Sequence, residues 1–144
     1  MKTPWHIWVV GLVTLLWHGF GAYDYTMSEL RDAAYLSMIP EEQRAAMLAY
    51  LDAMPWWAVA TWALGVWGSV LGSVLVLLRS RQAVGAFGVS LVGFIGTSAY
   101  TYFVAPASAM SGGGVALMIS GTILVILLAS LFYARAQVAA GRLR

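Results

Sequence analysis

Two histidines are the side chains in the long apolar segments of this 144-residue chain that could do acid–base or metal chemistry. His6 and His18 lie twelve positions apart, about 18 Å along a helix, so the two imidazoles cannot bind one metal ion. The sequence has no cysteine, no nucleotide-binding loop, no HExxH motif and no paired-carboxylate motif. These observations predict a protein that is not an enzyme and that holds no metal and no cofactor.

His18 and Asp24 belong to a local cluster at residues 17–25, where the first apolar segment ends. On a continuous helix Asp24 lies about 240° around the axis from His18, so the two side chains do not meet. Gly19 and Gly21 leave a second arrangement open, in which the helix end unwinds and the pair forms a polar floor that titrates near neutral pH. The sequence favours the first arrangement, with His18 at the outer interface and Asp24 at the start of the following loop.

Two tryptophans, Trp62 and Trp67, lie deeper in their apolar segment than the aromatic residues that mark membrane interfaces. Facing lipid is the commonest role of such a residue, and a stacking surface for a sugar ring is the alternative. In the next apolar segment, Thr97 and Tyr100 continue the helical face of Gly93. The candidate substrate-binding residues are therefore Trp17, His18, Asp24, Trp62, Trp67, Thr97 and Tyr100.

The composition predicts that these residues are positioned by membrane helices. Hydrophobic residues make up 61% of the chain and charged residues 10%, against about 45–50% and about 25% in soluble domains. Four segments, 5–22, 56–78, 83–104 and 115–133, are long enough to cross a hydrocarbon core of about 30 Å as helices. We expect an all-α membrane protein, a four-transmembrane-helix bundle in one domain over residues 1–144. A net charge of +2 without a basic run argues against a nucleic-acid partner.

The loop charges predict the orientation of the bundle. All six acidic residues lie between the first and second spans, with only two arginines beside them. The other six cations lie near the two termini and in the turn at 79–81, so both termini and this turn should be cytoplasmic. The loops at 26–54 and 106–114 should face outward. Three tryptophans and a poor cleavage site indicate that the first span is retained rather than removed as a signal peptide.

The outer loop at 26–54 is predicted to be helical. Thr26 and Glu29 have the spacing of a capping box, and Pro40 suits the first position of a second helix. Met47, Leu51 and other apolar residues then form one stripe that would lie on the membrane surface or against the bundle. The loop is either a lid over an outward-facing cavity or a connector whose acids are solvated, and the sequence favours the connector.

Small residues predict which helices pack most closely. Membrane helices approach each other through glycine, alanine and serine faces, which the second and third spans have and the fourth largely lacks. The second and third spans should therefore form the tight pair and the fourth should face lipid. The glycines serve either this internal packing, which we favour, or self-association. The predicted packing residues are Gly65, Gly68, Gly72, Gly93 and Gly96.

Two sequence blocks resemble those of a family of short proteobacterial inner-membrane proteins. Residues 21–27 read GAYDYTM and match a GAxDYxM block, and residues 62–73 read WALGVWGSVLGS and match a WALGVWGxxLGS block. The family often has Asn at the position of His18. Members are commonly labelled sugar transporters, so the resemblance implies a multi-pass protein of the bacterial inner (cytoplasmic) membrane and a role in transport.

Two functions therefore remain open. The first is facilitative transport of a small neutral solute such as a sugar; four helices are too few to enclose such a path comfortably, so this function calls for a homo-oligomer. The second is a non-catalytic accessory or assembly subunit of a larger membrane complex, which would explain the lack of polar residues in the fourth span. In either case membrane lipid is a partner.

Overall fold

The computed structural model describes residues 4–105 and 113–144, and these residues form helices joined by short turns. Four of the helices, counting a π-helical turn together with the helix before it, are long and apolar enough to cross a membrane. In chain order the elements are α1 (Trp5–Glu29), α2 (Ala33–Ser37), α3 (Glu41–Asp52), α4 (Trp56–Leu77), α5 (Ala83–Ala99), the π-helical turn η1 (Tyr100–Val104) and α6 (Gly113–Ala139).

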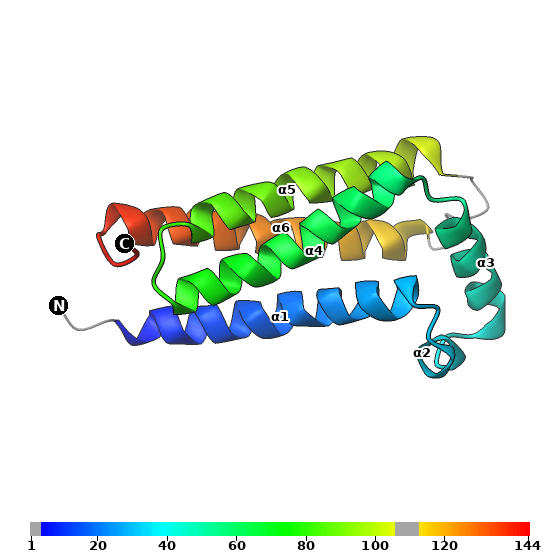
Figure 1. Cartoon of the computed structure of the whole chain (residues 1–144), viewed down its shortest axis with the longest axis horizontal. Coiled ribbons are helices and arrows are strands. Elements are labelled where there is room, and N and C mark those ends of the chain that lie inside the picture. Colours follow the sequence, from blue (N-terminus) through cyan, green and yellow to red (C-terminus); the bar gives the residue numbers. More distant parts are fainter. Residues whose placement is uncertain (1–3, 106–112) are drawn as a thin grey trace.

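The four long helices run lengthwise side by side, and α2 and α3 lie across one end of them (Figure 1). Along the chain, α1 packs against α4, α4 against α5, and α5 against α6. The start of α1, the end of α6 and the turn between α4 and α5 lie together at the opposite end. There the backbone N–H of Arg81 donates to the Arg144 carbonyl at 3.0 Å, and the Arg144 N–H donates to the Arg79 carbonyl at 2.8 Å. These two bonds tie the end of the chain to the α4–α5 turn.

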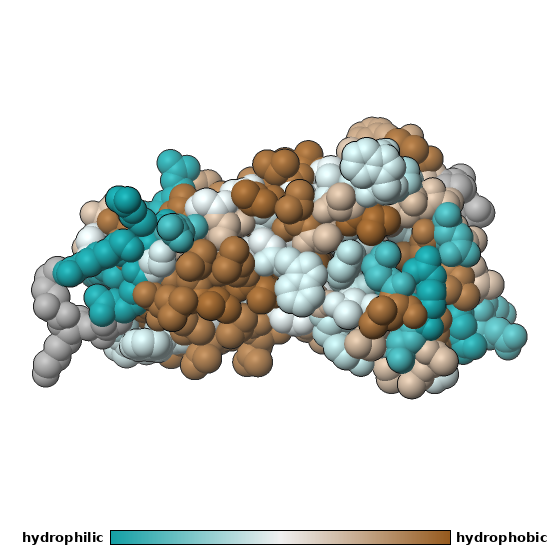
Figure 2. All heavy atoms as spheres, viewed as in Figure 1, coloured by the Kyte–Doolittle hydropathy of each residue, from teal (hydrophilic) through white to brown (hydrophobic). Residues whose placement is uncertain are grey.

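The surface between the two ends is apolar. Figure 2 shows a hydrophobic band across the middle of the molecule and hydrophilic residues gathered at both ends. Leu16 of α1, Val92 of α5 and Met118 of α6 are each at least 66% exposed. Exposed apolar surface of this extent is unfavourable in water and is typical of a surface that contacts lipid. Of the four spans, α6 is the most hydropathic and the least buried, as expected for the helix that faces lipid most.

The first span is longer than the sequence indicated. Helix α1 does not end at residue 22 but continues to Glu29, so the predicted capping box at 26–29 is wrong. The Thr26 hydroxyl instead donates to the Ala22 carbonyl inside the same helix, at 2.7 Å. The helix ends just before Arg31, which adopts a left-handed φ of 52° while the Asp32 N–H donates to the Met27 carbonyl.

The outer loop is helical, but its helices begin later than predicted. Asp32 caps α2 by accepting a hydrogen bond from the Tyr35 N–H at 2.8 Å. Pro40 directly precedes α3, whose first turn holds two glutamates as the helix dipole favours. An ion pair of 3.0 Å between Arg31 and Asp52 joins the end of α1 to the end of α3. This ion pair thus joins the two ends of the segment to each other.

Helices α4 and α5 form the closest pair. A Cβ added to Gly68 would lie 3.1 Å from the Ser90 backbone nitrogen, and one added to Gly65 would lie 3.3 Å from that of Phe94. On Gly72 or Gly96 it would overlap a side chain of the other helix, at 2.7 Å. All the predicted packing glycines, Gly93 included, therefore lie at this one interface, where the absence of side chains lets the backbones approach.

Of the later spans, the second ends one residue earlier than predicted and the fourth differs most. The third span has the predicted bounds, but its last five residues form the π-helical turn η1. The fourth span is longer than 115–133, because α6 extends from Gly113 to Ala139. Most of the loop predicted to face outward at 106–114 lies outside the described residues.

Candidate functional site

A cavity of about 320 Å³ lies among the four long helices, and it is the best candidate for a binding site. Its volume falls at the lower end of the range typical of small-molecule sites. Its walls come from all four spans. The lining residues are Trp17, His18, Phe20, Gly21, Asp24, Trp62, Gly65, Val66, Ser69, Ser90, Phe94, Thr97, Ser98, Thr101, Tyr102, Ile119, Ser120, Ile123 and Leu127.

The spacing of the lining residues explains how the helices build this cavity. On α5 and η1 they fall at 90, 94, 97, 98, 101 and 102, and all but the last share one face of a helix. On α4 they fall at 62, 65, 66 and 69, and on α6 at 119, 120, 123 and 127. Each helix thus turns one stripe toward the centre, and most lining positions on α4 and α5 hold small or hydroxyl-bearing residues.

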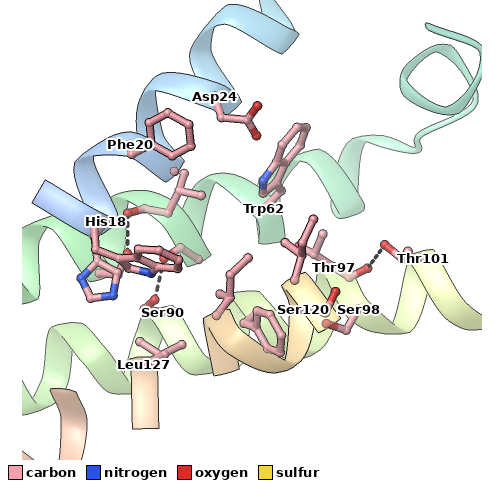
Figure 3. A pocket seen from close by; sticks show the side chains of 18 of the residues that line it. His18, Phe20, Asp24, Trp62, Ser90, Thr97, Ser98, Thr101, Ser120 and Leu127 are labelled. Carbon is pink, nitrogen blue, oxygen red and sulfur yellow. Dashed lines mark hydrogen bonds between the residues drawn. The ribbon is translucent and has the colours of Figure 1, made fainter. Parts of the chain in front are cut away.

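The cavity has an inner and an outer end. His18, Ser90 and Leu127 line the inner end, in the middle of the bundle, whereas Asp24 and Thr101 line the end nearer α2 and α3 (Figure 3). Asp24 lies six residues after His18, about 9 Å further along α1. The cavity therefore begins well inside the membrane-spanning part of the molecule and extends toward the end that carries the acidic residues.

His18 is buried at the inner end, with only 6% of its surface exposed, and not at the interface as the sequence suggested. Its Nδ1 lies 3.0 Å from the Ser73 hydroxyl oxygen on α4. Ser73 itself donates to the Ser69 carbonyl at 2.9 Å, so its oxygen accepts the bond from His18 and the Nδ1 atom carries the proton. Nε2 is then a hydrogen-bond acceptor, and it is buried without a partner among the described residues.

Asp24 has a partner other than His18. It remains inside α1, and the Tyr35 hydroxyl of α2 donates a hydrogen bond to it. Burial, together with this bond to Asp24, raises the pKa of Tyr35 to about 12. Neither arrangement considered from the sequence is therefore observed: the helix end does not unwind to pair His18 with Asp24, and Asp24 does not begin the loop.

Four of the six serine and threonine hydroxyls that line the cavity donate to backbone carbonyls. Ser90 donates to the Gly65 carbonyl across the α4–α5 interface at 2.5 Å, and Ser69 donates to the Val66 carbonyl at 2.8 Å. Thr101 donates to the Thr97 carbonyl at 2.9 Å, a bond drawn in Figure 3. Because their protons are used in this way, these hydroxyls present lone pairs to a bound molecule. Ser120 instead accepts a hydrogen bond from Tyr102, so its own proton is available to a bound molecule.

Five of the seven predicted binding residues line this cavity and two do not. Trp17, His18, Asp24, Trp62 and Thr97 are brought together there. Trp62 also packs edge-to-face against Tyr25, with ring centroids 4.8 Å apart, which holds the indole in place. Trp67 instead lies 51% exposed outside the cavity, and Tyr100 is buried against Met54 and Ala58 in a separate cluster.

The lining residues that were not predicted as binding residues include Ser90, Phe94, Ser98, Thr101, Tyr102 and Ser120. The first four share one face of the third span with Thr97, at intervals of three or four residues. That spacing was the available signal for them. Tyr102 and Ser120 are joined by a hydrogen bond of 2.8 Å between η1 and α6, which no spacing within one segment could reveal.

The cavity reaches the side of the bundle between α1 and α6, two long helices that pack little against each other. Phe20 on α1 and Ile119 on α6 both line it, yet they are 69% and 56% exposed. Nearer the basic end the gap is closed, because His6 Nδ1 and the Tyr133 hydroxyl are hydrogen-bonded at 2.7 Å and Ile7 is fully buried. The opening between α1 and α6 is thus confined to the part of the apolar band nearer α2 and α3.

The arrangement is suited to binding a molecule. It offers carbon surface, aromatic rings and hydrogen-bond acceptors in a space of molecular size. Within residues 4–105 and 113–144, no three histidine, aspartate or glutamate side chains lie close enough to hold a metal ion. Comparisons with protein-family models, curated proteins and solved structures found no match to this chain.

Proposed function

We propose that this multi-pass membrane protein binds a small neutral solute in the cavity between its helices and facilitates passage of that solute across the membrane. The observation that carries the proposal is the position of the cavity, which starts at His18 in the middle of the bundle and runs toward Asp24 at one end. Small-molecule sites between the helices of a bundle have this volume and this mixture of apolar walls and a few polar groups.

A neutral solute suits this lining better than an ion. Asp24 is the one acidic or basic side chain, histidine aside, among the lining residues, and it already accepts a hydrogen bond from Tyr35. A charge held at the inner end would have no opposite charge beside it, and the cost of placing a charge in the hydrocarbon region is high. We therefore exclude ion-coupled pumping from the proposal and keep passive movement down a gradient.

An oligomer is part of the proposal. The cavity is open on the side between α1 and α6, and the inner end is separated from the basic end by Ile7 and the apolar side chains packed with it. A second copy seated at that side would enclose the path, in agreement with the argument that four helices are too few. We further propose a bacterial inner membrane, with the arginine-rich end in the cytoplasm, on the basis of the charge distribution and the sequence resemblance.

A second candidate function is supported by α6. This helix carries the most hydropathic surface of the four spans, and little of it is buried. Such a face could pack against another membrane protein, as in an accessory or assembly subunit. Native mass spectrometry from a mild detergent separates the two candidates: a homo-oligomer supports the carrier, and a stable complex with a different protein supports the subunit.

Solute flux into proteoliposomes tests the carrier directly, with glycerol, erythritol and glucose as probes of increasing size. We expect at least one of them to enter faster than into protein-free vesicles. Gly21→Leu should abolish the difference, because Gly21 lines the cavity and a side chain there would meet nothing but open space. Gly19→Leu is the matched control, since it adds the same side chain to open space outside the cavity. Background rates for all three solutes would contradict the proposal.

A further inference from the structure

We infer that four side chains of the cavity bind a vicinal diol, a pair of hydroxyl groups on adjacent carbon atoms. These side chains, which we call the outer quartet, are Asp24, Trp62, Ser98 and Ser120, one from each long helix. The inference rests on the proposed function for its choice of site. It adds the chemical class of the solute and the residues that select it.

The outer quartet lies at one level of the bundle. Each member is five to seven residues from the end of its helix that lies nearer α2 and α3, when η1 is counted with α5. At 1.5 Å per residue this is a depth of about 10 Å. In Figure 3 all four side chains lie on the Thr101 side of His18. The quartet can therefore contact one small molecule in the outer part of the cavity.

Two members of the quartet, Ser98 and Ser120, keep a hydroxyl proton that other residues of the same helices use internally. On α6, Ser130 donates to the carbonyl four residues before it at 2.8 Å, and on α5 Thr97 does the same at 3.1 Å. Ser98 makes no hydrogen bond to another described residue, and its oxygen is not buried. Ser120 accepts a bond from Tyr102, which makes its own proton a stronger donor because linked hydrogen bonds polarise one another. Both hydroxyls are therefore donors toward the cavity.

Trp62 adds a third donor, and Asp24 adds an acceptor. The Trp62 Nε1–H and one carboxylate oxygen of Asp24 have no partner among the described residues, and neither atom is buried. The other oxygen of Asp24 accepts the bond from Tyr35, which fixes the orientation of the carboxylate. The quartet thus offers three donors and one charged acceptor.

This combination of donors and acceptor specifies hydroxyl groups. One hydroxyl of a diol can donate to Asp24 while the oxygens of both accept from the serines and the indole. An ether has no proton for Asp24 and would leave a carboxylate oxygen without the hydrogen bond that it makes to water. Phe94 and Ile123 line the same cavity and supply apolar contacts for the carbon atoms. Glycerol, erythritol and glucose, the probes of the transport test, all carry adjacent hydroxyls.

Three isomers with four carbon and two oxygen atoms test the inference, because they differ only in their hydroxyl groups. Butane-2,3-diol has adjacent hydroxyls, butane-1,4-diol has separated ones, and 1,2-dimethoxyethane has none. Each is titrated into the full chain in lipid nanodiscs, and binding is followed by the Nε1–H resonance of Trp62 in ¹⁵N-tryptophan-labelled protein. Trp62→Phe identifies this resonance. We expect the 2,3-diol to bind about tenfold more tightly than the ether, the effect of a hydrogen bond to a charged group, and the 1,4-diol to fall between them.

Substitution of the serines locates the effect. Ser98→Ala and Ser120→Ala each remove one donor, and each should weaken binding of the 2,3-diol by roughly threefold to tenfold. Ser130→Ala is the control for Ser120→Ala, because it removes a hydroxyl from the same helix outside the cavity. It should leave the affinity unchanged. Circular dichroism shows whether each variant keeps its helices.

Asp24→Asn should remove the selection for hydroxyl groups. The Tyr35 hydroxyl keeps the amide oxygen directed toward itself, so the amide NH₂ group takes the place of the free carboxylate oxygen. The quartet then holds donors only, and the ether should bind as tightly as the 2,3-diol. A tenfold preference for the diol that persists in Asp24→Asn would overturn the inference.

The outcomes are separate from those of the transport test. Equal binding of the three isomers, no binding of any of them, or unchanged affinity for the 2,3-diol in both serine variants would also overturn the inference. If the 2,3-diol binds with the expected preference but no solute crosses the vesicle membrane, the carrier function fails and the diol site stands. If polyols cross at the wild-type rate in Asp24→Asn and in both serine variants, the carrier function stands and the diol site fails.

Discussion

Gly93 of α5 lies so close to Gly65 of α4 that a methyl group on Gly93 would overlap the Gly65 backbone nitrogen. The same methyl group would lie 2.5 Å from the Thr61 carbonyl oxygen. Both neighbours are backbone atoms, which cannot rotate away as a side chain can. The two glycines therefore set the distance between α4 and α5, and this distance in turn brings the Ser90 hydroxyl within 2.5 Å of the Gly65 carbonyl at the cavity wall.

Gly93→Ala should destabilise the protein because the two helices must separate to admit the methyl group. Overpacking of a tight interface costs about 1–3 kcal/mol, and we expect a loss in this range in the free energy of unfolding. The measurement is titration of the detergent-solubilised protein with sodium dodecyl sulfate, followed by circular dichroism.

Gly88→Ala is the control for this prediction. Gly88 lies on the same helix, but a methyl group there would meet no atom within 4 Å. Alanine also favours the helical conformation over glycine, by roughly 0.5–1 kcal/mol. Gly88→Ala should therefore be neutral or slightly stabilising. If the two variants lost the same stability, close packing at Gly93 would not be the reason.

The bond from Tyr35 to Asp24 predicts a pH dependence at the outer end of the cavity. Burial and the bond to Asp24 raise the pKa of Tyr35 from 10.0 to about 12. Because the folded state favours the protonated phenol, its stabilising contribution is fully present below pH 10 and is lost as the pH rises through about 12. The hydrogen-exchange rate of the α2 backbone amides, corrected for the intrinsic rate at each pH, should therefore stay constant up to this range. Above it the rate should rise, because the bond to Asp24 is lost.

Tyr35→Phe provides the comparison. The difference in phenolate absorbance between wild type and this variant isolates the titration of one residue, whose midpoint should lie near 12. The variant should also show faster exchange of the α2 amides already at neutral pH, since the bond to Asp24 is missing at every pH. A midpoint close to that of a free tyrosine would mean that the phenol is solvated and that the bond to Asp24 does not form.

The orientation of the bundle can be tested with introduced cysteines, because the chain has none of its own. Glu42→Cys places a thiol at the start of α3, and Arg81→Cys places one in the α4–α5 turn, at the opposite end of the bundle. In intact cells a membrane-impermeant maleimide should label the first and not the second, and both after lysis. Labelling of Arg81→Cys alone would invert the orientation, and equal labelling of both would contradict the membrane arrangement.

The four spans could be predicted from the sequence because hydropathy is a local property, whereas the end of α1 could not. Residues 23–29 are mostly polar, and Thr26 and Glu29 have the spacing of a helix start. The helix nevertheless continues, since Asp24 obtains a partner from α2 and Arg31 supplies the turn that ends the helix. Both reasons lie in other parts of the fold.

The residues of the cavity could be predicted only in part, because the sequence does not say which face of each helix points into the bundle. Trp62 and Trp67 are five residues apart, about 140° around a helix, so the two indoles could not face one cavity. Because of the way α4 packs against α5, Trp62 lines the cavity and Trp67 does not. Likewise Tyr100 lies about 100° from Thr101, and it packs against Met54 instead. The depth of His18 followed from the same kind of tertiary contact, its bond to Ser73.

The gap between Phe20 and Ile119 has a consequence for how occupancy should be expressed. A site that is filled sideways from the bilayer responds to the number of ligand molecules per lipid, and not to their number per volume of buffer. Diluting a vesicle suspension would leave such a site as full as before when the ligand stays in the lipid. Adding empty vesicles would lower the occupancy of the site, because the same amount of ligand would then be distributed over more lipid.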